Sequence, residues 1–244
     1  TDLPFPMRVT SRDHEDGQST VAKISIAARI MHDFEATWID RFMQIIHQHR
    51  DRIGTETLKV NILDYMKELN ATKVKVDFNY PFFIEKTTPV SKEKCLVRYF
   101  CTYSASVAKS DLKPKVTLKI NAPCITTYPV SSPDKPGGLF GQMSVVDIEV
   151  QSQKDIFPED LVDLVDKNAL MPVYSYLTEE DQTYLIQKVH SSSKTSVIMV
   201  DEIKEDLANM REIDGYSVTC SNFGMLHSYS TFIGIAKSMW IPLS

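Results

Sequence analysis

The chain has 244 residues, of which 27 are Lys or Arg and 32 are Asp or Glu, so its net charge is -5. Because nucleic acids and anionic membrane surfaces attract clustered Lys and Arg, this charge argues against both as main partners. The chain is 43% hydrophobic, yet no apolar run approaches the roughly 20 residues of a membrane helix. We therefore expect a cytoplasmic globular protein whose partner is a small molecule.

Strand and helix patterns alternate in the first half of the chain. Residues 20–30 switch between apolar and polar side chains, which predicts a half-buried strand. Apolar stripes within 38–46 and 58–69 predict two helices. The alternation returns at 73–80 and predicts another strand. Pro81 and Pro89 indicate a turn between them, and residues 95–107 predict a further strand.

The second half repeats this order of elements. Predicted strands at 115–120 and 142–150 enclose a long loop, and helices are expected at 158–169, 179–190 and 196–210. Residues 215–223 and 226–236 predict a final hairpin around Gly224. The pattern indicates an α+β protein with antiparallel sheets, helices on one face, and two tandem modules at 1–110 and 111–244.

The long loop is the first candidate for a functional site. Residues 121–144 hold four of the 12 prolines and three of the 8 glycines, so fixed and free backbone angles are mixed there. Ordered loops of this length inside a compact domain are usually functional. We expect this segment to form one wall of a binding site.

Titratable side chains provide few further candidates. The four cysteines form no CxxC pair and no metal-binding spacing, which favours reduced thiols. His47 and His49 are two positions apart on a predicted helix, so they point about 200° apart and cannot share a metal ion. His227 is predicted on the last strand, beside polar Ser228, Tyr229 and Ser230. It is either a functional histidine or a structural one.

Four blocks of the chain resemble the type IB GTP cyclohydrolases. They read LPFPMRVTSRD, YPFFIEKTTPVS, LMPVYSYL and SNFGMLHSYS, and their order holds over nearly the whole chain. The resemblance implies the tunnelling fold, in which antiparallel sheets of several subunits form a barrel with helices outside. It also implies a homotetramer with sites at the subunit interfaces.

The resemblance implies a changed metal site. That family opens the imidazole ring of GTP with a metal-activated water, and a Cys, a His and a Glu hold the metal. In this chain these three positions fall on Tyr128, Phe140 and Gln182. These side chains offer no thiolate, imidazole or carboxylate, so we expect no bound metal and no other cofactor.

Two further positions differ from the family, and three agree with it. The Glu that would bind the guanine edge falls on Val197, and Trp38 stands where the family usually has His. His227, Glu85 and Lys86 match the family's site blocks. The resemblance therefore predicts a pocket that is more apolar than a nucleotide site, with substrate-binding residues Trp38, Glu85, Val130, Phe140, Met143 and Val197.

Three hypotheses follow from this pocket. The first is a repurposed, metal-independent enzyme that cyclises, isomerises or hydrolyses a small, less polar metabolite in a specialised biosynthetic pathway. His227 would be its general acid or base, and Tyr128 and Gln182 would donate hydrogen bonds to an oxyanion. The second is a catalytically inactive relative that acts as a ligand-binding, regulatory or scaffold protein. The third is a metal site rebuilt from Cys124, His227 and an acidic neighbour.

Overall fold

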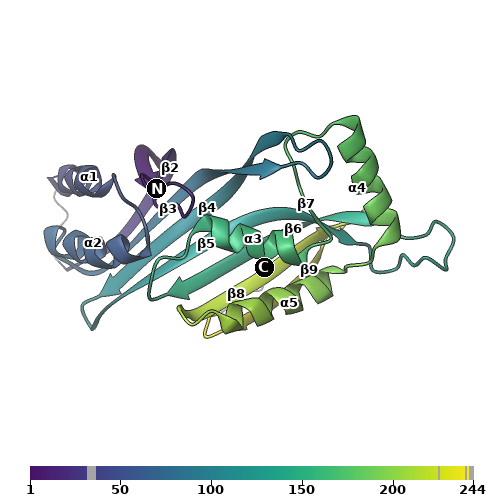
Figure 1. Ribbon diagram of the computed structural model, residues 1–244. Helices are drawn as coiled ribbons and strands as arrows, with labels where there is room; N and C mark the ends of the chain where they lie inside the picture. The colour runs from purple at the N-terminus through teal and green to yellow at the C-terminus, as the bar shows by residue number, and fades with distance from the viewer. Residues whose placement is uncertain (32–36, 225, 240, 242–244) are drawn as a thin grey trace. The chain divides into compact units, whose positions relative to one another are not determined.

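The computed structural model describes residues 1–31, 37–224, 226–239 and 241 (Figure 1). Its helices are α1 (Thr37–His49), α2 (Thr55–Glu68), α3 (Pro158–Asn168), α4 (Glu179–Ser191) and α5 (Ser196–Asn209). Its strands are β1 (Leu3–Val9), β2 (Gln18–Ile30), β3 (Ala71–Thr87), β4 (Lys94–Ala108), β5 (Asp111–Thr127), β6 (Gly141–Ser152), β7 (Met171–Pro172), β8 (Ile213–Phe223) and β9 (Thr231–Lys237).

The strands form one sheet in the order β1-β2-β3-β4-β5-β6-β8-β9, and β7 pairs with β5. The pairs β1 with β2, β2 with β3, and β8 with β9 are antiparallel. Side chains along β4, β5 and β6 alternate between buried and more exposed positions. This alternation is typical of a sheet with one face packed against the core, and it confirms the α+β class.

The chain forms two compact units, each built from several stretches. Unit 1 comprises residues 1–82, 100–119 and 150–159, and unit 2 comprises residues 83–99, 120–149 and 160–244. In unit 1, α1 and α2 pack on each other, whereas in unit 2, α5 lies along β8 and β9 (Figure 1). The modules predicted at 1–110 and 111–244 describe a repeated order of elements along the chain. The two compact units describe which residues contact one another, so the two modules stay a prediction.

Three segments differ from the sequence prediction. β1 was not predicted; Pro4 and Pro6 lack an N–H donor, and β1 tolerates them because it lies at the end of the strand order, where β2 is its neighbour in the sheet. Pro81 lies inside β3, beyond Asn79, the last residue that pairs with β2, so the turn is confined to 88–93. The long loop is also shorter than predicted, because β5 runs to Thr127 and β6 begins at Gly141.

One site residue also lies on a different kind of segment than predicted. The final hairpin forms, but β9 begins at Thr231, so His227 lies in the connection between β8 and β9 and is exposed. The polar run at 227–230 therefore belongs to a loop. Among the described residues, none of the helices combines the length and the apolar character needed to cross a lipid bilayer.

Candidate functional site

Four aromatic rings of unit 2 stack in a column. Phe140 and Tyr128 have ring centroids 4.8 Å apart with planes at 20°, and Tyr128 and His227 are 6.5 Å apart at 27°. His227 and Tyr229 are again 4.8 Å apart, at 16°. We call these four residues the ring column. It joins the 128–140 loop to the loop between β8 and β9.

Tyr128 is the anchored member of the ring column. Its side chain is only 5% exposed, and its backbone N–H donates to the carbonyl of Phe140 at 2.9 Å, which closes the loop at its base. A Cβ at Gly224 would lie 3.0 Å from Cε2 of Tyr128. A larger residue at position 224 would therefore push against the ring, so this glycine permits the close approach of the two loops.

A buried polar network lies next to the ring column. Gln142 Nε2 donates to Thr126 Oγ1 at 3.2 Å, the hydroxyls of Thr126 and Ser144 are 2.8 Å apart, and Ser144 donates to Asn222 Oδ1 at 2.8 Å. Asn222 Nδ2 reaches the hydroxyl oxygens of Ser196 and Thr231, each at 3.1 Å. The network therefore connects β5, β6 and β8 with α5 and β9; its members are Thr126, Gln142, Ser144, Ser196, Asn222 and Thr231.

This network was not predicted from the sequence, although the chain contains a signal for it. Gln142 and Ser144 occupy inward positions of β6, where Val146, Ile148 and Val150 follow at the same period. Thr126 and Asn222 occupy the inward positions near the ends of β5 and β8. Polar side chains at the buried positions of several strands are costly unless they bond to one another, so they indicate a shared polar site.

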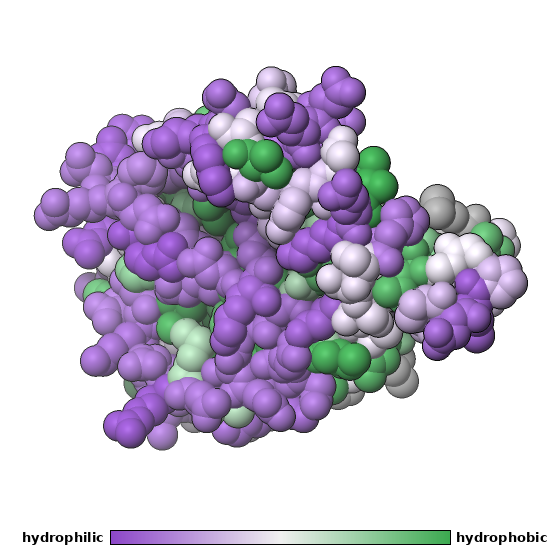
Figure 2. All heavy atoms as spheres, turned by 45° about the vertical axis from the view of Figure 1, so that its right-hand side comes forward, coloured by the Kyte–Doolittle hydropathy of each residue, from purple (hydrophilic) through white to green (hydrophobic). Residues whose placement is uncertain are grey.

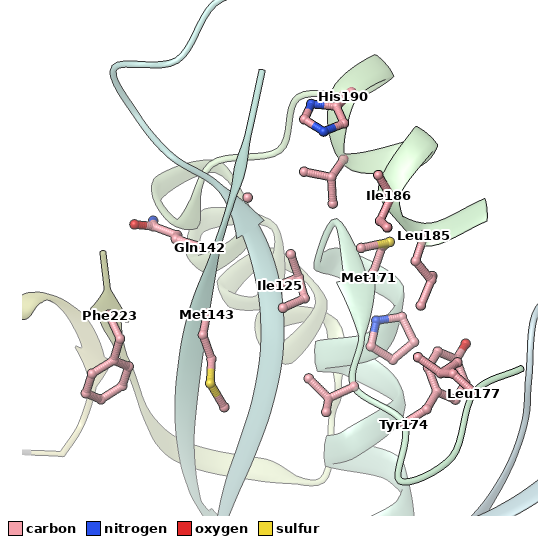
Figure 3. Close-up of a pocket in the computed structure, with 14 residues that line it drawn as sticks. Ile125, Gln142, Met143, Met171, Tyr174, Leu177, Leu185, Ile186, His190 and Phe223 are labelled. Carbon is pink, nitrogen blue, oxygen red and sulfur yellow. The ribbon is translucent and has the colours of Figure 1, made fainter. Parts of the chain in front are cut away.

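An apolar cavity of about 520 Å³ opens beside Gln142. Figure 3 shows Met143 and Phe223 on one side of it and Leu185, Ile186 and His190 of α4 on another. His190 is held by a 2.6 Å hydrogen bond between its Nδ1 and the carbonyl of Leu139. The backbone carbonyl can only accept, so Nδ1 carries the proton.

The predicted substrate-binding residues of unit 2 are placed in different surroundings. Met143 lines the cavity, and Phe140 belongs to the ring column. Val130 and Val197 are 63% and 60% exposed, and neither lines this cavity. Glu85 is exposed and forms an ion pair with Lys94 at 2.8 Å.

Trp38 and Gln182 have local structural contacts. Trp38 lies in unit 1 and lines a small apolar cavity with residues that include Phe42 and Leu69. Gln182 is exposed on α4, and its Nε2 donates to the carbonyl of Leu177 at 3.3 Å. Of the three predicted catalytic residues, His227 and Tyr128 come together in the ring column.

Lys86, from the same matching block as Glu85, forms a buried ion pair with Asp166. Its ammonium also lies 5.3 Å from the ring centroid of Tyr99. Burial raises the pKa of Asp166, and Lys86 opposes that shift. This part of the block therefore packs strand β3 against α3 in the core of unit 2.

The donor atoms near the candidate site do not form a metal centre. In the described part of the chain, no group of three or more His, Cys, Asp and Glu side chains is arranged to hold a metal ion. Cys124 is fully buried, its Sγ lies 3.7 Å from Sδ of Met199, and burial raises the pKa of its thiol well above the ordinary value. A rebuilt site from Cys124 and His227 has no support in this geometry.

Comparison with known proteins gives a consistent result. A family model described as type I GTP cyclohydrolase folE2 matches residues 1–232. GTP cyclohydrolase FolE2 of Geobacter sp. strain M21 is 32% identical over 238 residues, which are 97% of this chain and 87% of that protein. The protein of the same name from Citrifermentans bemidjiense is 30% identical with the same coverage.

Solved structures with the same fold include two uricases. That of Bacillus fastidious has a TM-score of 0.59 at 9% identity, covering 95% of this chain and 88% of its own. That of Arthrobacter globiformis has a TM-score of 0.54 at 10% identity, covering 96% of this chain and 90% of its own. At such low identity the likeness concerns the fold alone, and it confirms the predicted tunnelling fold.

These comparisons overturn two of the three hypotheses. Relatives that match almost the whole chain are named GTP cyclohydrolases. The hypothesis of an enzyme repurposed for a less polar metabolite, and the alternative of an inactive homologue, are therefore wrong. Both relied on changes at single positions such as Tyr128 and Val197 and gave too little weight to the similarity of the whole chain.

Proposed function

Since the chain belongs to the type I GTP cyclohydrolase FolE2 family, we propose that it is an enzyme that hydrolyses the purine ring of GTP. The observation that carries this proposal is the family match over residues 1–232, which includes both loops of the ring column and every member of the buried polar network. The finer assignment to type IB is part of the same proposal.

The residues around the ring column have the chemistry that such a hydrolysis requires. A water oxygen adds to the carbon between the two nitrogens of the imidazole ring, a carbon–nitrogen bond breaks, and the leaving nitrogen takes up a proton. His227 is exposed on its loop and stacks against Tyr128. Because imidazole is the commonest general acid and base in enzymes, we assign the proton transfers to His227.

Polar groups near the ring column would orient the substrate. Gln142 and Ser144 are both buried in the polar network. Tyr128 would donate a hydrogen bond to developing negative charge. The same role for Gln182 stays a prediction, since its amide donates to Leu177 on α4.

The three positions that the resemblance assigns to metal ligands do not fit a metal ion. Phe140 has no donor atom, Tyr128 is packed between Phe140 and the Gly224 backbone, and Gln182 would offer only a neutral amide. We therefore propose that hydrolysis by this chain does not depend on a metal centre held by these residues.

Incubation with GTP tests both parts of the proposal. The purified protein is incubated with GTP alone, with a chelator, and with added zinc, and the products are measured by mass spectrometry. We expect a product one water heavier than GTP, formed at the same rate with the chelator. His227→Ala should slow its formation about 10²- to 10⁴-fold, whereas Ser228→Ala, the matched control on the same loop, should not.

The outcomes separate the two parts. If GTP stays unchanged in all three incubations, the proposed activity is wrong. If the chelator abolishes turnover and zinc restores it, the activity stands and its independence from a metal is wrong.

A further inference from the structure

We propose that a hollow between the ends of β3, β4 and β5 binds the phosphate chain of a small anion, either free pyrophosphate or the tail of a nucleotide. The hollow measures about 190 Å³, and its polar lining residues are Lys73, Ser106, Asp111, Lys113 and Lys115. All of them lie in unit 1, and we call this set the lysine hollow. None of the four blocks that resemble the cyclohydrolases contains any of these residues.

The backbone around the lysine hollow is firmly held. Residues 109 and 110 form the turn between β4 and β5, and the N–H of Lys109 donates to the carbonyl of Thr72 at 2.8 Å, which ties the turn to the start of β3. The N–H of Lys113 donates to Oδ1 of Asp111 at 3.3 Å. The charged side chains therefore extend from strands whose positions are already fixed, so a ligand does not have to order a loop.

The three ammonium groups of the lysine hollow differ from a neighbouring lysine in their partners. Lys75, two residues after Lys73 on the same strand, forms an ion pair with Asp77 at 2.9 Å. Within the described ranges, no ion pair joins Lys73, Lys113 or Lys115 to a carboxylate. Acidic residues outnumber basic ones in the chain, 32 to 27. The missing partners therefore do not result from a shortage of carboxylates.

A fourth cation lies on the same face of the sheet. Arg29 of β2 is directly opposite Lys73 of β3 in the antiparallel register, and like charges in this arrangement destabilise the pairing. Asp111 supplies a single negative charge to the hollow and already accepts from a backbone N–H. The cluster therefore keeps an excess of positive charge, which a bound anion would compensate.

The chemistry of the lysine hollow favours a phosphate chain among small anions. Lysine ammonium groups bind phosphate oxygens as point charges, and the hydroxyl of Ser106 can donate to a further oxygen. A carboxylate carries one charge, whereas linked phosphates carry several along their length and can reach lysines of β3 and β5 together. A nucleic acid would need a more extended basic surface, and the net charge of -5 opposes its binding.

Isothermal titration calorimetry with pyrophosphate at low salt tests this site. The double variant Lys113→Gln with Lys115→Gln removes two charges from the hollow. Lys167→Gln with Lys204→Gln is the matched control, which removes two lysine charges from helices of unit 2. We expect the first variant to bind about 25-fold more weakly, since one charge pair about 4 Å apart in water contributes about fivefold. The control should bind within about twofold of the unchanged protein.

Lys73→Gln provides a second readout, which a merely solvated lysine would not change. Removal of this charge relieves the repulsion with Arg29, so the midpoint of thermal unfolding without added anion should rise by about 1 to 4 °C. Pyrophosphate should raise the midpoint of the unchanged protein more than that of the variant. A midpoint that falls in Lys73→Gln would contradict the repulsion on which the site depends.

A comparison of anions identifies the source of the phosphate chain. ATP that binds more tightly than pyrophosphate indicates a nucleotide, and equal affinities indicate the free anion. Sulfate that binds as tightly as pyrophosphate would show adventitious anion binding only and would overturn the site. Pyrophosphate binding that is the same in the Lys113 and Lys115 double variant, or no binding at low salt, would also overturn it. Because no arm measures turnover of GTP, these results do not depend on the proposed function.

Discussion

At the scale of single residues, Asn222 connects more of the candidate site than any ring does. Its side chain is 2% exposed, accepts from Ser144 and contacts the hydroxyl oxygens of Ser196 and Thr231. A buried amide with all these partners is satisfied, but each partner depends on it in turn. Removal of this one side chain takes Asn222 away from the buried hydroxyl of Ser196, whereas Ser144 keeps Thr126 and Thr231 is exposed.

We expect Asn222→Ala to lower the free energy of unfolding by about 1–3 kcal/mol, the usual cost of unsatisfied buried polar groups. Urea unfolding measures this value. Ser221→Ala is the matched control, because Ser221 is the neighbour in β8 that faces the other way, and it should change stability by less than about 0.5 kcal/mol. Equal unfolding midpoints for the two variants would contradict the structural role of the network.

At the scale of elements, Asp181 ties the start of α4 to the turn between β3 and β4. Its carboxylate accepts from the hydroxyl of Thr178 at 2.7 Å, from the hydroxyl of Ser91 at 2.6 Å, and from the backbone N–H groups of Val90 and Ser91. Burial alone raises the pKa of this carboxyl, but the hydrogen bonds from Ser91, Thr178 and Val90 outweigh it, and the pKa is well below its ordinary value. The charged form is therefore the form that holds this corner together.

Because folding lowers the pKa of Asp181, this carboxylate stabilises the folded protein more at higher pH than at lower pH. The contribution of Asp181 to stability is fully present above its unfolded-state pKa of about 3.9, and it decreases as the pH falls toward the lower folded-state pKa. Asp181→Asn should therefore be less stable than the unchanged protein near neutral pH, and the difference should shrink below about pH 4.

Urea unfolding at a series of pH values measures this difference. Asp134→Asn, a substitution at an exposed position of the 128–140 loop, is the matched control and should show no such trend. A difference between Asp181→Asn and the unchanged protein that stays constant into the acid range would show that the carboxylate charge is not what ties α4 to the turn.

At the scale of the whole molecule, the surface retains exposed apolar side chains on its strands. In unit 2, Leu96 is 60% exposed, and Phe83, Phe223 and Phe232 are each between 42% and 50% exposed. Figure 2 shows apolar groups that interrupt the polar surface at several places on one face. Single exposed apolar side chains are ordinary on protein surfaces, so the expectation of further chains comes from the resemblance.

We therefore predict a homotetramer, as the resemblance implies. Native mass spectrometry should show a species of four times the mass of one chain, and Leu96→Lys should shift the population toward smaller species because it places a charge on an apolar position. Leu63→Lys, at a similarly apolar but less exposed position on α2, is the comparison variant. A single-chain mass for the unchanged protein at micromolar concentration would contradict the tetramer.

Much of the fold was predictable from the sequence alone. Alternation at 20–30 and apolar stripes at 38–46 and 58–69 correctly predicted β2, α1 and α2, because these patterns repeat within a few residues of each other. The resemblance carried by four sequence blocks, in the same order over nearly the whole chain, also implied the tunnelling fold. The buried side of a strand or helix is set by residues within the same segment, so the sequence of that segment is enough to predict it.

The tertiary structure alone decided the candidate site. His227 and Tyr128 are almost a hundred residues apart in the sequence, and their stacking depends on where two loops end and on Gly224, which lets those loops approach. Ser144 and Asn222 are separated by 78 residues and meet inside the sheet. The pattern within one segment does not predict a contact between residues that are far apart in the sequence. Such a contact stabilises the protein only when both groups are buried at the same place, away from water.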